Sequence, residues 1–558
     1  MTDFLTSKKS YFLYFFIVVL FYWDTRDAGF VTDFLGWQYS FDKGTFWEII
    51  HASDRGIKSL YHLTHLEMYT MSALFGTWGL PWFLLFSTLF ALNAWLIARF
   101  SMKFTQNLKI ERVEWPIFFG VLCFLLSPYQ AEVMVWRASF HYLTGFAMML
   151  SFLVLAQKYV ELPKNKYAII ANILFLASTL TLEFFFLTPF LTSVLLAFYY
   201  FSASKSVNLK FDAKKTALLF VGLPLVSLGV YFITFHAIYG RWIAHYGVSA
   251  HDTFYTPEAA ATYGKYVMKH MSCLRHFYLV LPEKYANYKD KIFNLFDAPT
   301  VSWVIYALVV SAFLFGLSRF KTLAPKVKFI YFNFIFFSTL ILPVVTLFFA
   351  TLLLSENDRL GFMASPFLFI GFFTVLSYLP KRIFIAVSVL YLTFNAFFLV
   401  KTTQFWFKSE KIYGKLVQGF KWWDADEVLI LNLPDNFHGV PMFRMLKSNT
   451  AFAESLEAFQ RRKVTSKMYD VQRYNLANDS DGVRVRVDST NHLTVLFNQF
   501  GNWWHKETEY STDLYATKDI VGGYEVTLKP TDKKRVILFQ TGSEWHIVDL
   551  SKIGVEQR

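Results

Sequence analysis

The chain has 558 residues, of which 55% are hydrophobic, 20% aromatic and only 17% charged, with 65 Phe. A soluble chain of this size carries roughly 25% charged residues, so the composition argues against an ordinary soluble protein. The formal net charge is +13, but Lys and Arg cluster between apolar runs. That distribution follows the positive-inside pattern and argues against a nucleic-acid-binding face.

Long apolar runs recur along the first 400 residues. They lie at about 11–23, 80–98, 115–127, 141–157, 167–182, 184–202, 216–238, 300–318, 329–353, 361–379 and 383–400. A membrane span needs roughly 20 residues at a rise of 1.5 Å each, so we predict an α-helical polytopic membrane protein with about eleven transmembrane helices. The first and third runs are short. Lys8 and Lys9 precede the first run without a small-residue cleavage site after it, which predicts an uncleaved first helix.

The basic residues indicate an orientation, because alternate connections between the apolar runs carry them. The clusters are Lys8 and Lys9; Arg99, Lys103, Lys109 and Arg112; Lys158, Lys164 and Lys166; Lys205, Lys210, Lys214 and Lys215; Arg319, Lys321, Lys326 and Lys328; and Lys381 and Arg382. This places the N-terminus in the cytoplasm, and if the cell is bacterial the membrane is the inner one. Segments 24–79, 128–140, 239–299 and 354–360, with everything after 401, are then expected outside.

Two outer loops, 24–79 and 239–299, are long and rich in Trp, Tyr and His. Their apolar residues recur at helical spacing, which predicts amphipathic helices at the membrane interface. The residues that carry this pattern are Phe46, Trp47, Ile49 and Ile50 in the first loop, and Tyr263, Tyr266, Val267 and His270 in the second.

The composition changes after residue 401. We predict a membrane domain over 1–400, a connecting helix over 401–424 and a small, β-rich extracytoplasmic domain over 425–558. Val483, Val485 and Val487 alternate with arginines, as in a half-buried strand. Further strands are predicted at His492–Phe497, Tyr524–Leu528, Arg535–Phe539 and Trp545–Leu550, between Gly, Asp and Asn turns.

Cofactor motifs give little guidance. The two cysteines, Cys123 and Cys273, are too few and too separated for a metal cluster, and a disulfide between them is not expected. The sequence has no Gly-rich phosphate loop, Cys/His metal spacing or nucleophile elbow. No cofactor is therefore assigned, and a divalent metal stays an open question.

The strongest local feature follows the first apolar run. Asp24, Asp27 and Asp33 lie close to Arg26 in a segment predicted to be outside the membrane. A carboxylate there, Asp33 or Asp27, could act as a general base, hold a cation or orient an acceptor hydroxyl. The alternative is a solvated loop with a local ion pair.

A second cluster lies between the third and fourth runs, where Glu132 and Arg137 are followed by His141. Charge in so short a connection is costly unless it is paired or functional. Arg137 could neutralise Glu132, which would make the cluster structural. Glu183 stands between two apolar runs with no charge close in sequence, and either marks the end of a hairpin or points into a shared cavity.

A third cluster, Ser355-Glu356-Asn357-Asp358-Arg359, lies in a short outer turn. Arg359 could pair bidentately with a phosphate, or it could be neutralised by Glu356 or Asp358. His62 and His65 belong to the same outer face and rank lower as candidates.

These clusters, in this order, resemble the GT-C superfamily of membrane glycosyltransferases over residues 1–400. Gly29-Phe30-Val31-Thr32-Asp33 looks like the first-loop acidic motif of that family. The protein O-mannosyltransferase-like branch is resembled by Leu60-Tyr61-His62-Leu63-Thr64, Leu74-Phe75-Gly76, Ala91-Leu92-Asn93-Ala94, the Pro128…Glu132…Trp136-Arg137 segment, Glu183 and Asp358-Arg359. The chain departs from the family where Phe34 replaces a second acid and Phe90 a frequent His, and tetratricopeptide repeats are absent from the sequence.

The resemblance implies a function and a set of roles. A polyprenyl-phosphate-linked sugar would place its phosphate near Arg359, with Asp358 beside it. The carboxylate of Asp33 would take the proton from an acceptor hydroxyl, with Asp27 and Glu132 as further catalytic candidates and Glu132 also orienting acceptor and sugar. Arg137, His141, Glu183, His62 and His65 would bind or orient substrates. The acceptor would be a glycan, a lipid or a protein.

Two other functions remain open. A transporter or flippase for a lipid-linked glycan needs a cavity and charges but no base. Such proteins often show internal repeats and broken helices, whereas here no repeat is evident and the polar residues favour one face. A scaffold whose β domain binds partners would leave the outer acidic clusters without a role.

Overall fold

The computed structural model describes residues 1–31, 33–51, 60–202, 212–242, 257–281, 285–345, 358–443, 451–498, 502–504 and 509–557. The chain divides into two compact units. Unit 1 comprises Met1–Asp27, Phe46–Leu352 and Asn357–Thr403, and unit 2 comprises Ala28–Thr45, Leu353–Glu356 and Gln404–Arg558. Unit 2 thus takes a short N-terminal segment that the sequence assigned to the membrane domain.

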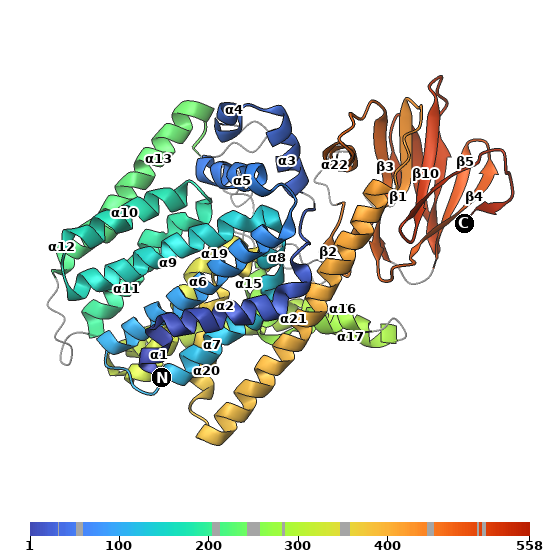
Figure 1. Ribbon diagram of the computed structural model, residues 1–558. Coiled ribbons are helices and arrows are strands. Elements are labelled where there is room, and N and C mark those ends of the chain that lie inside the picture. The colour runs from blue at the N-terminus through green and yellow to red at the C-terminus, as the bar shows by residue number, and fades with distance from the viewer. Residues whose placement is uncertain are drawn as a thin grey trace. The chain divides into compact units, whose positions relative to one another are not determined.

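Unit 1 is helical (Figure 1). Its helices are α1 (Thr2–Thr6), α2 (Lys8–Tyr22), η1 (Trp23–Thr25), α4 (Phe46–His51), α5 (His62–Phe75), α6 (Gly79–Asn107), α7 (Glu114–Leu126), η2 (Pro128–Gln130), α8 (Ala131–Val135), η3 (Arg137–Ser139), α9 (Phe140–Glu161), α10 (Asn165–Thr179), η4 (Glu183–Leu187), α11 (Thr188–Ser202), α12 (Ala213–Ala217), η5 (Leu218–Gly222), α13 (Leu223–Tyr239), α15 (Pro257–Ser272), α16 (Leu274–Val280), α17 (Ala286–Asp297), α18 (Pro299–Arg319), η7 (Phe320–Thr322), α19 (Pro325–Val345), η8 (Asp358–Gly361) and α20 (Ser365–Leu376). Helix α21 (Lys381–Gln418) runs from unit 1 into unit 2.

Seven helical segments of the described chain are long and apolar enough to cross a membrane, and an eighth is the bent pair Glu114–Leu126 with Pro128–Val135. Each apolar run found in the sequence contains a helix. The expected number of spans, about eleven, counts four runs whose helices are short: α2 has 15 residues, α7 has 13, α10 has 15 and α20 has 12. By length, seven helical segments can each span a membrane alone, and α7 can do so only together with η2 and α8 as the bent pair.

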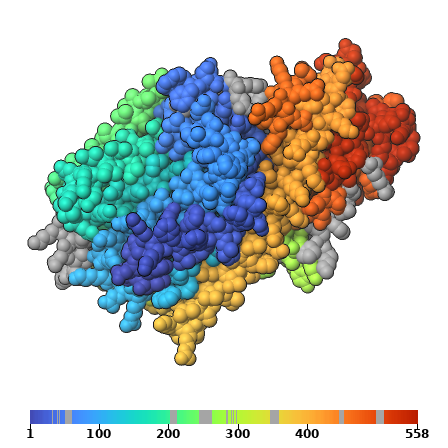
Figure 2. All heavy atoms as spheres, viewed as in Figure 1, coloured from blue at the N-terminus to red at the C-terminus, as the bar shows by residue number. Residues whose placement is uncertain are grey.

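Aromatic side chains fill the core of unit 1. Phe104 of α6 stacks on Phe332 of α19 with ring centroids 3.7 Å apart, and Phe100 lies against Phe336 at 5.5 Å. The abundance of Phe in the sequence is thus used between helices as well as on their outer surfaces. Figure 2 shows side chains of the N-terminal helices of unit 1, coloured blue, packed against one another on the visible face.

Polar side chains fix the pairing of α6 with α9. Asn93 of α6 donates to the carbonyl of Leu143 on α9 at 3.0 Å, and Gln157 of α9 donates back to Phe100 of α6 at 3.1 Å. Because an unpaired amide inside an apolar protein is costly, these reciprocal bonds set the register of the two helices.

Unit 2 is built around a sheet. Its strands are β1 (Glu427–Phe437), β2 (Val440–Pro441), β3 (Lys467–Leu476), β4 (Gly482–Ser489), β5 (His492–Asn498), β6 (Asn502–Trp504), β7 (Glu509–Ser511), β8 (Tyr515–Ile520), β9 (Gly523–Leu528), β10 (Arg535–Thr541), β11 (Glu544–Ile547) and β12 (Glu556–Gln557), with helices α3 (Asp33–Lys43) and α22 (Ala451–Gln460). The strand order is β6-β3-β1-β10-β4-β5-β9-β8-β7.

The predicted β-rich domain is confirmed. β4 carries the Val483, Val485, Val487 alternation, and all three valines are buried in the sheet's core. The sequence missed β1 and β3, which pair in parallel with one another, while β1 also pairs in parallel with β10. Strand β1 is buried along its whole length, so it lacks the alternation that reveals a half-buried strand.

The segment with the Tyr263 and Tyr266 pattern is α15. These tyrosines and His270 are buried in unit 1, where α15 packs against α18 and α19. The helix is amphipathic as predicted, but the apolar face that was expected at the membrane interface contacts protein.

Candidate functional site

A buried cluster of charges in unit 1 joins three segments that are far apart in the sequence. The carboxylates are Glu132 of α8 and Asp358 of η8, and the cations are Lys269, Arg275 and Arg359. We call these five residues the ion-pair cluster. The two carboxylates also interact electrostatically with one another and with the neighbouring cations.

Glu132 is bound by Arg359 through both carboxylate oxygens. The backbone N–H of Arg359 donates to Oε2 at 2.7 Å, and its Nη1 donates to Oε1 at 2.6 Å. The guanidinium also lies over the Trp136 ring, 5.1 Å from its centroid. Glu132 is 1% exposed, whereas the Arg359 side chain keeps 11% exposure. The cluster therefore approaches the surface at Arg359.

Asp358 is held by two cations. Its Oδ1 lies 2.5 Å from Nζ of Lys269 and 2.6 Å from Nη1 of Arg275, and its Oδ2 lies 2.5 Å from Nη2 of Arg275. Asp358 is thus paired with Lys269 and Arg275 and not with Arg359, while Glu356, the other partner expected for Arg359, lies outside the described residues. The reason is that α15 and α16 bring basic residues from another segment.

The cations respond differently to burial. Burial lowers the pKa of Lys269, and the negative charge of Asp358 opposes that shift. For Arg275 burial also acts to lower the pKa, but Asp358 outweighs it and the pKa is raised. Arg275 therefore stays charged, and Lys269 is the group of the pair that most readily becomes neutral.

His270, His276, Tyr129 and Tyr266 surround Lys269 and Arg275. Burial, with Lys269 and Arg275 nearby, lowers the pKa of His270 to about 3 and that of His276 well below its ordinary value. Both rings are therefore neutral at physiological pH. The Tyr129 ring lies between them, with Arg275 4.8 Å from its centroid. Within the described chain, both ring nitrogens of His270 and the hydroxyl of Tyr129 have no hydrogen-bond partner.

Arg137 is not the partner of Glu132, although the sequence allowed that pairing. Its Nη2 donates to the carbonyls of Thr25 at 3.0 Å and Arg26 at 3.3 Å, and it lies over the Phe86 ring. It thus ties η3, which precedes α9, to the end of η1, which follows α2, while Glu132 is neutralised by Arg359.

The other sequence candidates are distributed around unit 1. His141 begins α9 and lies close enough to Arg359 and His65 to interact electrostatically with both. His62 and His65 lie at the start of α5. Glu183 begins η4, half-buried, in electrostatic contact with Tyr231 of α13. The structure therefore places His141 near both Arg359 and His65.

The first-loop acids are separated. Asp27 of unit 1 is 62% exposed and pairs with Arg26 at 3.3 Å, which fits the solvated-loop alternative. Asp33 begins α3 in unit 2, and its side chain lies outside the described part. The role expected for Asp33 in proton transfer remains a prediction.

Sequence reasoning missed Lys269, Arg275 and His276, which lie in or beside the ion-pair cluster, and it gave no role to Glu67 of α5, which accepts a hydrogen bond from Thr144 of α9. Lys269, His270, Arg275 and His276 put four basic or imidazole side chains into eight residues of the second outer loop. That density in a predicted outer loop was the available signal. Glu67 is the only acid of α5, in a helix that otherwise carries mostly apolar residues.

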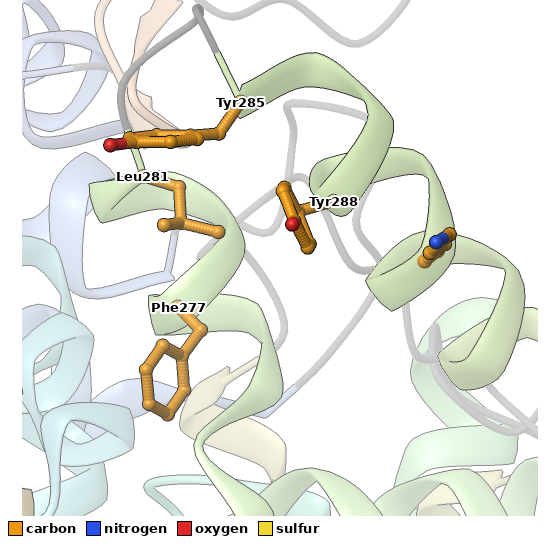
Figure 3. A pocket seen from close by; sticks show the side chains of 5 residues that line it. Phe277, Leu281, Tyr285 and Tyr288 are labelled. Carbon is orange, nitrogen blue, oxygen red and sulfur yellow. The ribbon is translucent and has the colours of Figure 1, made fainter.

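A cavity of about 430 Å³ lies between α16 and α17 (Figure 3). Its lining is Phe277, Leu281, Tyr285, Tyr288 and Lys291. In Figure 3, the Tyr285 ring lies near Leu281, and Tyr288 lies toward the space between the two helices. The lining is apolar apart from Lys291, so this cavity offers hydrophobic contact and lacks the paired charges of the cluster.

In the described ranges, His, Cys, Asp and Glu form no group of three or more that could hold a metal ion. The structure thus defines a class of protein: a mostly helical chain whose apolar helices suit a membrane, joined to a C-terminal β unit. No family model, no curated protein and no solved structure matches the chain.

Proposed function

We propose that the chain is a membrane glycosyltransferase of GT-C type, which moves a sugar from a polyprenyl-phosphate-linked donor to an acceptor hydroxyl on the non-cytoplasmic side. The observation that supports this most is the ion-pair cluster. Five charged side chains from three distant segments meet inside a chain dominated by apolar helices. Buried charge in such a protein is costly and typically marks a substrate path or a reaction site.

The charge balance of the cluster suits an anionic substrate. Three cations face two carboxylates, so the fully ionised cluster has an excess positive charge that an anion would neutralise. Arg359 lies nearest the surface, at 11% exposure against 1% for Lys269. A planar guanidinium pairs well with phosphate oxygens, so Arg359 is assigned to the donor phosphate.

The chemistry then needs few parts. Phosphate is a good leaving group once its charge is neutralised, which the basic cluster supplies without a nucleotide-binding domain. A carboxylate accepts the proton of the acceptor hydroxyl as that oxygen attacks the anomeric carbon. The acceptor is a glycan, a lipid or a protein, and the β unit serves to cover the site or to select the acceptor.

The test uses purified protein in vesicles with a panel of radiolabelled polyprenyl-phosphate hexoses and cell-envelope acceptors. The readout is release of polyprenyl phosphate. Arg359→Lys keeps the positive charge but loses the two parallel N–H donors of the guanidinium. The donor KM is therefore expected to rise about tenfold, which corresponds to ~1.4 kcal/mol of lost charge-assisted hydrogen bonding. Exposed Arg382→Lys, at the start of α21, is the matched control and is expected to leave the KM unchanged.

Two results would contradict the proposal. One is wild-type protein that consumes none of the donors. The other is movement of intact donor across the vesicle without sugar release, which would identify the chain as a flippase of a lipid-linked glycan.

A further inference from the structure

Glu67 occupies a fixed position on the face where α5 meets α9. Its Oε2 accepts a hydrogen bond from the Thr144 hydroxyl of α9 at 3.0 Å. The start of α5 is held by the turn after α10, because Leu63 N–H donates to Leu180 at 3.1 Å and the Thr64 hydroxyl donates to Thr181 at 2.9 Å. Glu67 lies one turn after these two residues, so its position is fixed by α9 and by the turn after α10.

This part of α9 has one accessible stripe. His141, Thr144 and Met148 are half-buried, whereas the residues between them are buried. The spacing of three and four residues puts them on one face of the helix. Glu67 is itself half-buried and is bonded to the middle member of the stripe. His141, one turn before Thr144, interacts electrostatically with Arg359. The stripe thus leads from Glu67 toward the ion-pair cluster.

The carboxylate has the properties of a base. Burial raises the pKa of Glu67 to about 7, and the Thr144 hydrogen bond acts to lower it. Within the described residues, no Lys or Arg forms an ion pair with Glu67. A base whose pKa lies near the working pH is well suited to take a proton in the reaction.

We propose that Glu67 is the general base of the transfer, an assignment that rests on the proposed function and gives to Glu67 the role predicted for Asp33. The acceptor hydroxyl binds at the stripe of α9 between Glu67 and His141. Its proton passes to the Glu67 carboxylate, and its oxygen forms the new bond to the anomeric carbon. The bond from that carbon to the donor phosphate oxygen breaks, and its electron pair leaves with the polyprenyl phosphate.

Several titratable groups lie on the elements that pack around Glu67. They include His62, His65 and Tyr69 on α5 itself, His141 and Tyr142 on α9 and Glu48 on α4, where the side chain of His51 lies outside the described residues; α6 has none in its first twenty residues. The Thr144 hydroxyl is the one that hydrogen-bonds Glu67. Removing the Thr144 hydroxyl is therefore a way to shift the pKa of Glu67 while its carboxylate is kept.

The test compares pH profiles of polyprenyl phosphate release for full-length Glu67→Gln, Asp33→Asn and Thr144→Val. Glu67→Gln is expected to lower kcat at least a hundredfold, to abolish the rise in rate near pH 7 and to leave the donor KM within twofold. Thr144→Val removes the hydrogen bond that lowers the pKa of Glu67, so the rise is expected to move to higher pH. Glu161→Gln, at the far end of α9, is the matched control and is expected to retain the wild-type profile.

The outcomes separate this assignment from the function on which it rests. If the wild type transfers sugar but Glu67→Gln keeps its kcat and its rise near pH 7, Glu67 is not the base. Loss of that rise in Asp33→Asn alone would return the role to Asp33. A Thr144→Val profile that coincides with the wild type would also contradict the assignment. A wild type without donor consumption would remove the proposed function, and the assignment with it.

Discussion

Asp358 is the residue on which the buried cluster depends most. Its two oxygens balance Lys269 and Arg275, both 1% exposed. A buried cation that loses its partner cannot be solvated, and breaking a buried pair from one side costs about 3–5 kcal/mol. The carboxylate therefore stabilises the packing of α15 and α16 against η8.

We expect Asp358→Asn to lower the free energy of unfolding by about 3–5 kcal/mol, because Asn keeps the shape but not the charge. Thermal unfolding of the purified protein in detergent measures the effect. Glu161→Gln is the control, since the Lys103–Glu161 pair is about one-third exposed and such pairs contribute about 0–1 kcal/mol. Equal midpoints for the two variants would show that the buried pairing contributes little.

At the scale of helices, Gly120 decides how closely α7 and α20 approach. A Cβ at this position would lie 2.6 Å from Cγ1 of Ile370 and 2.8 Å from its Cα. Because the second contact is with backbone, the helices would have to separate to admit a side chain. α7 is one arm of the bent pair that leads into η2 and α8, so its position also sets that of Glu132.

Gly120→Ala is expected to destabilise the protein by about 1–3 kcal/mol through overpacking. Gly229→Ala on α13 is the matched control, because a Cβ there meets nothing within 4 Å. In that open position Ala is expected to stabilise by roughly 0.5–1 kcal/mol. Thermal midpoints that fall for Gly229 but not for Gly120 would refute this account of the helix pair.

At the scale of the whole molecule, the basic clusters predict how the chain is oriented in the membrane. The basic clusters predict a cytoplasmic N-terminus and an outer β unit. Both native cysteines are buried, so they give little background in labelling experiments. Val521 is fully exposed at 101%, in the turn between β8 and β9, and Lys164 is exposed between α9 and α10.

We expect a membrane-impermeant maleimide to label Val521→Cys in intact cells, in a background of Cys123→Ala and Cys273→Ala. Lys164→Cys is expected to react only after the cells are permeabilised, because its loop is predicted to be cytoplasmic. Labelling of the two positions under the same condition would overturn the predicted topology.

The sequence by itself determined which apolar segments of unit 1 are helical and what kind of domain follows. Apolar runs of helical length form helices because the backbone must satisfy its own hydrogen bonds wherever apolar side chains exclude water. The Val483, Val485, Val487 alternation identified β4 because a strand with one buried face repeats every two residues. The sequence also singled out Glu132, Asp358 and Arg359 as charges that need partners.

Only the tertiary structure decided what those partners are. Glu132 and Arg359 are 227 positions apart, and no local spacing encodes that contact. The same is true of β1 beside β10, whose strands begin at Glu427 and Arg535. Lys269 and Arg275 join the ion-pair cluster because α15 and α16 pack where they do. Long-range packing selects among charge pairs that are equivalent in sequence, because only burial makes an unpaired charge costly.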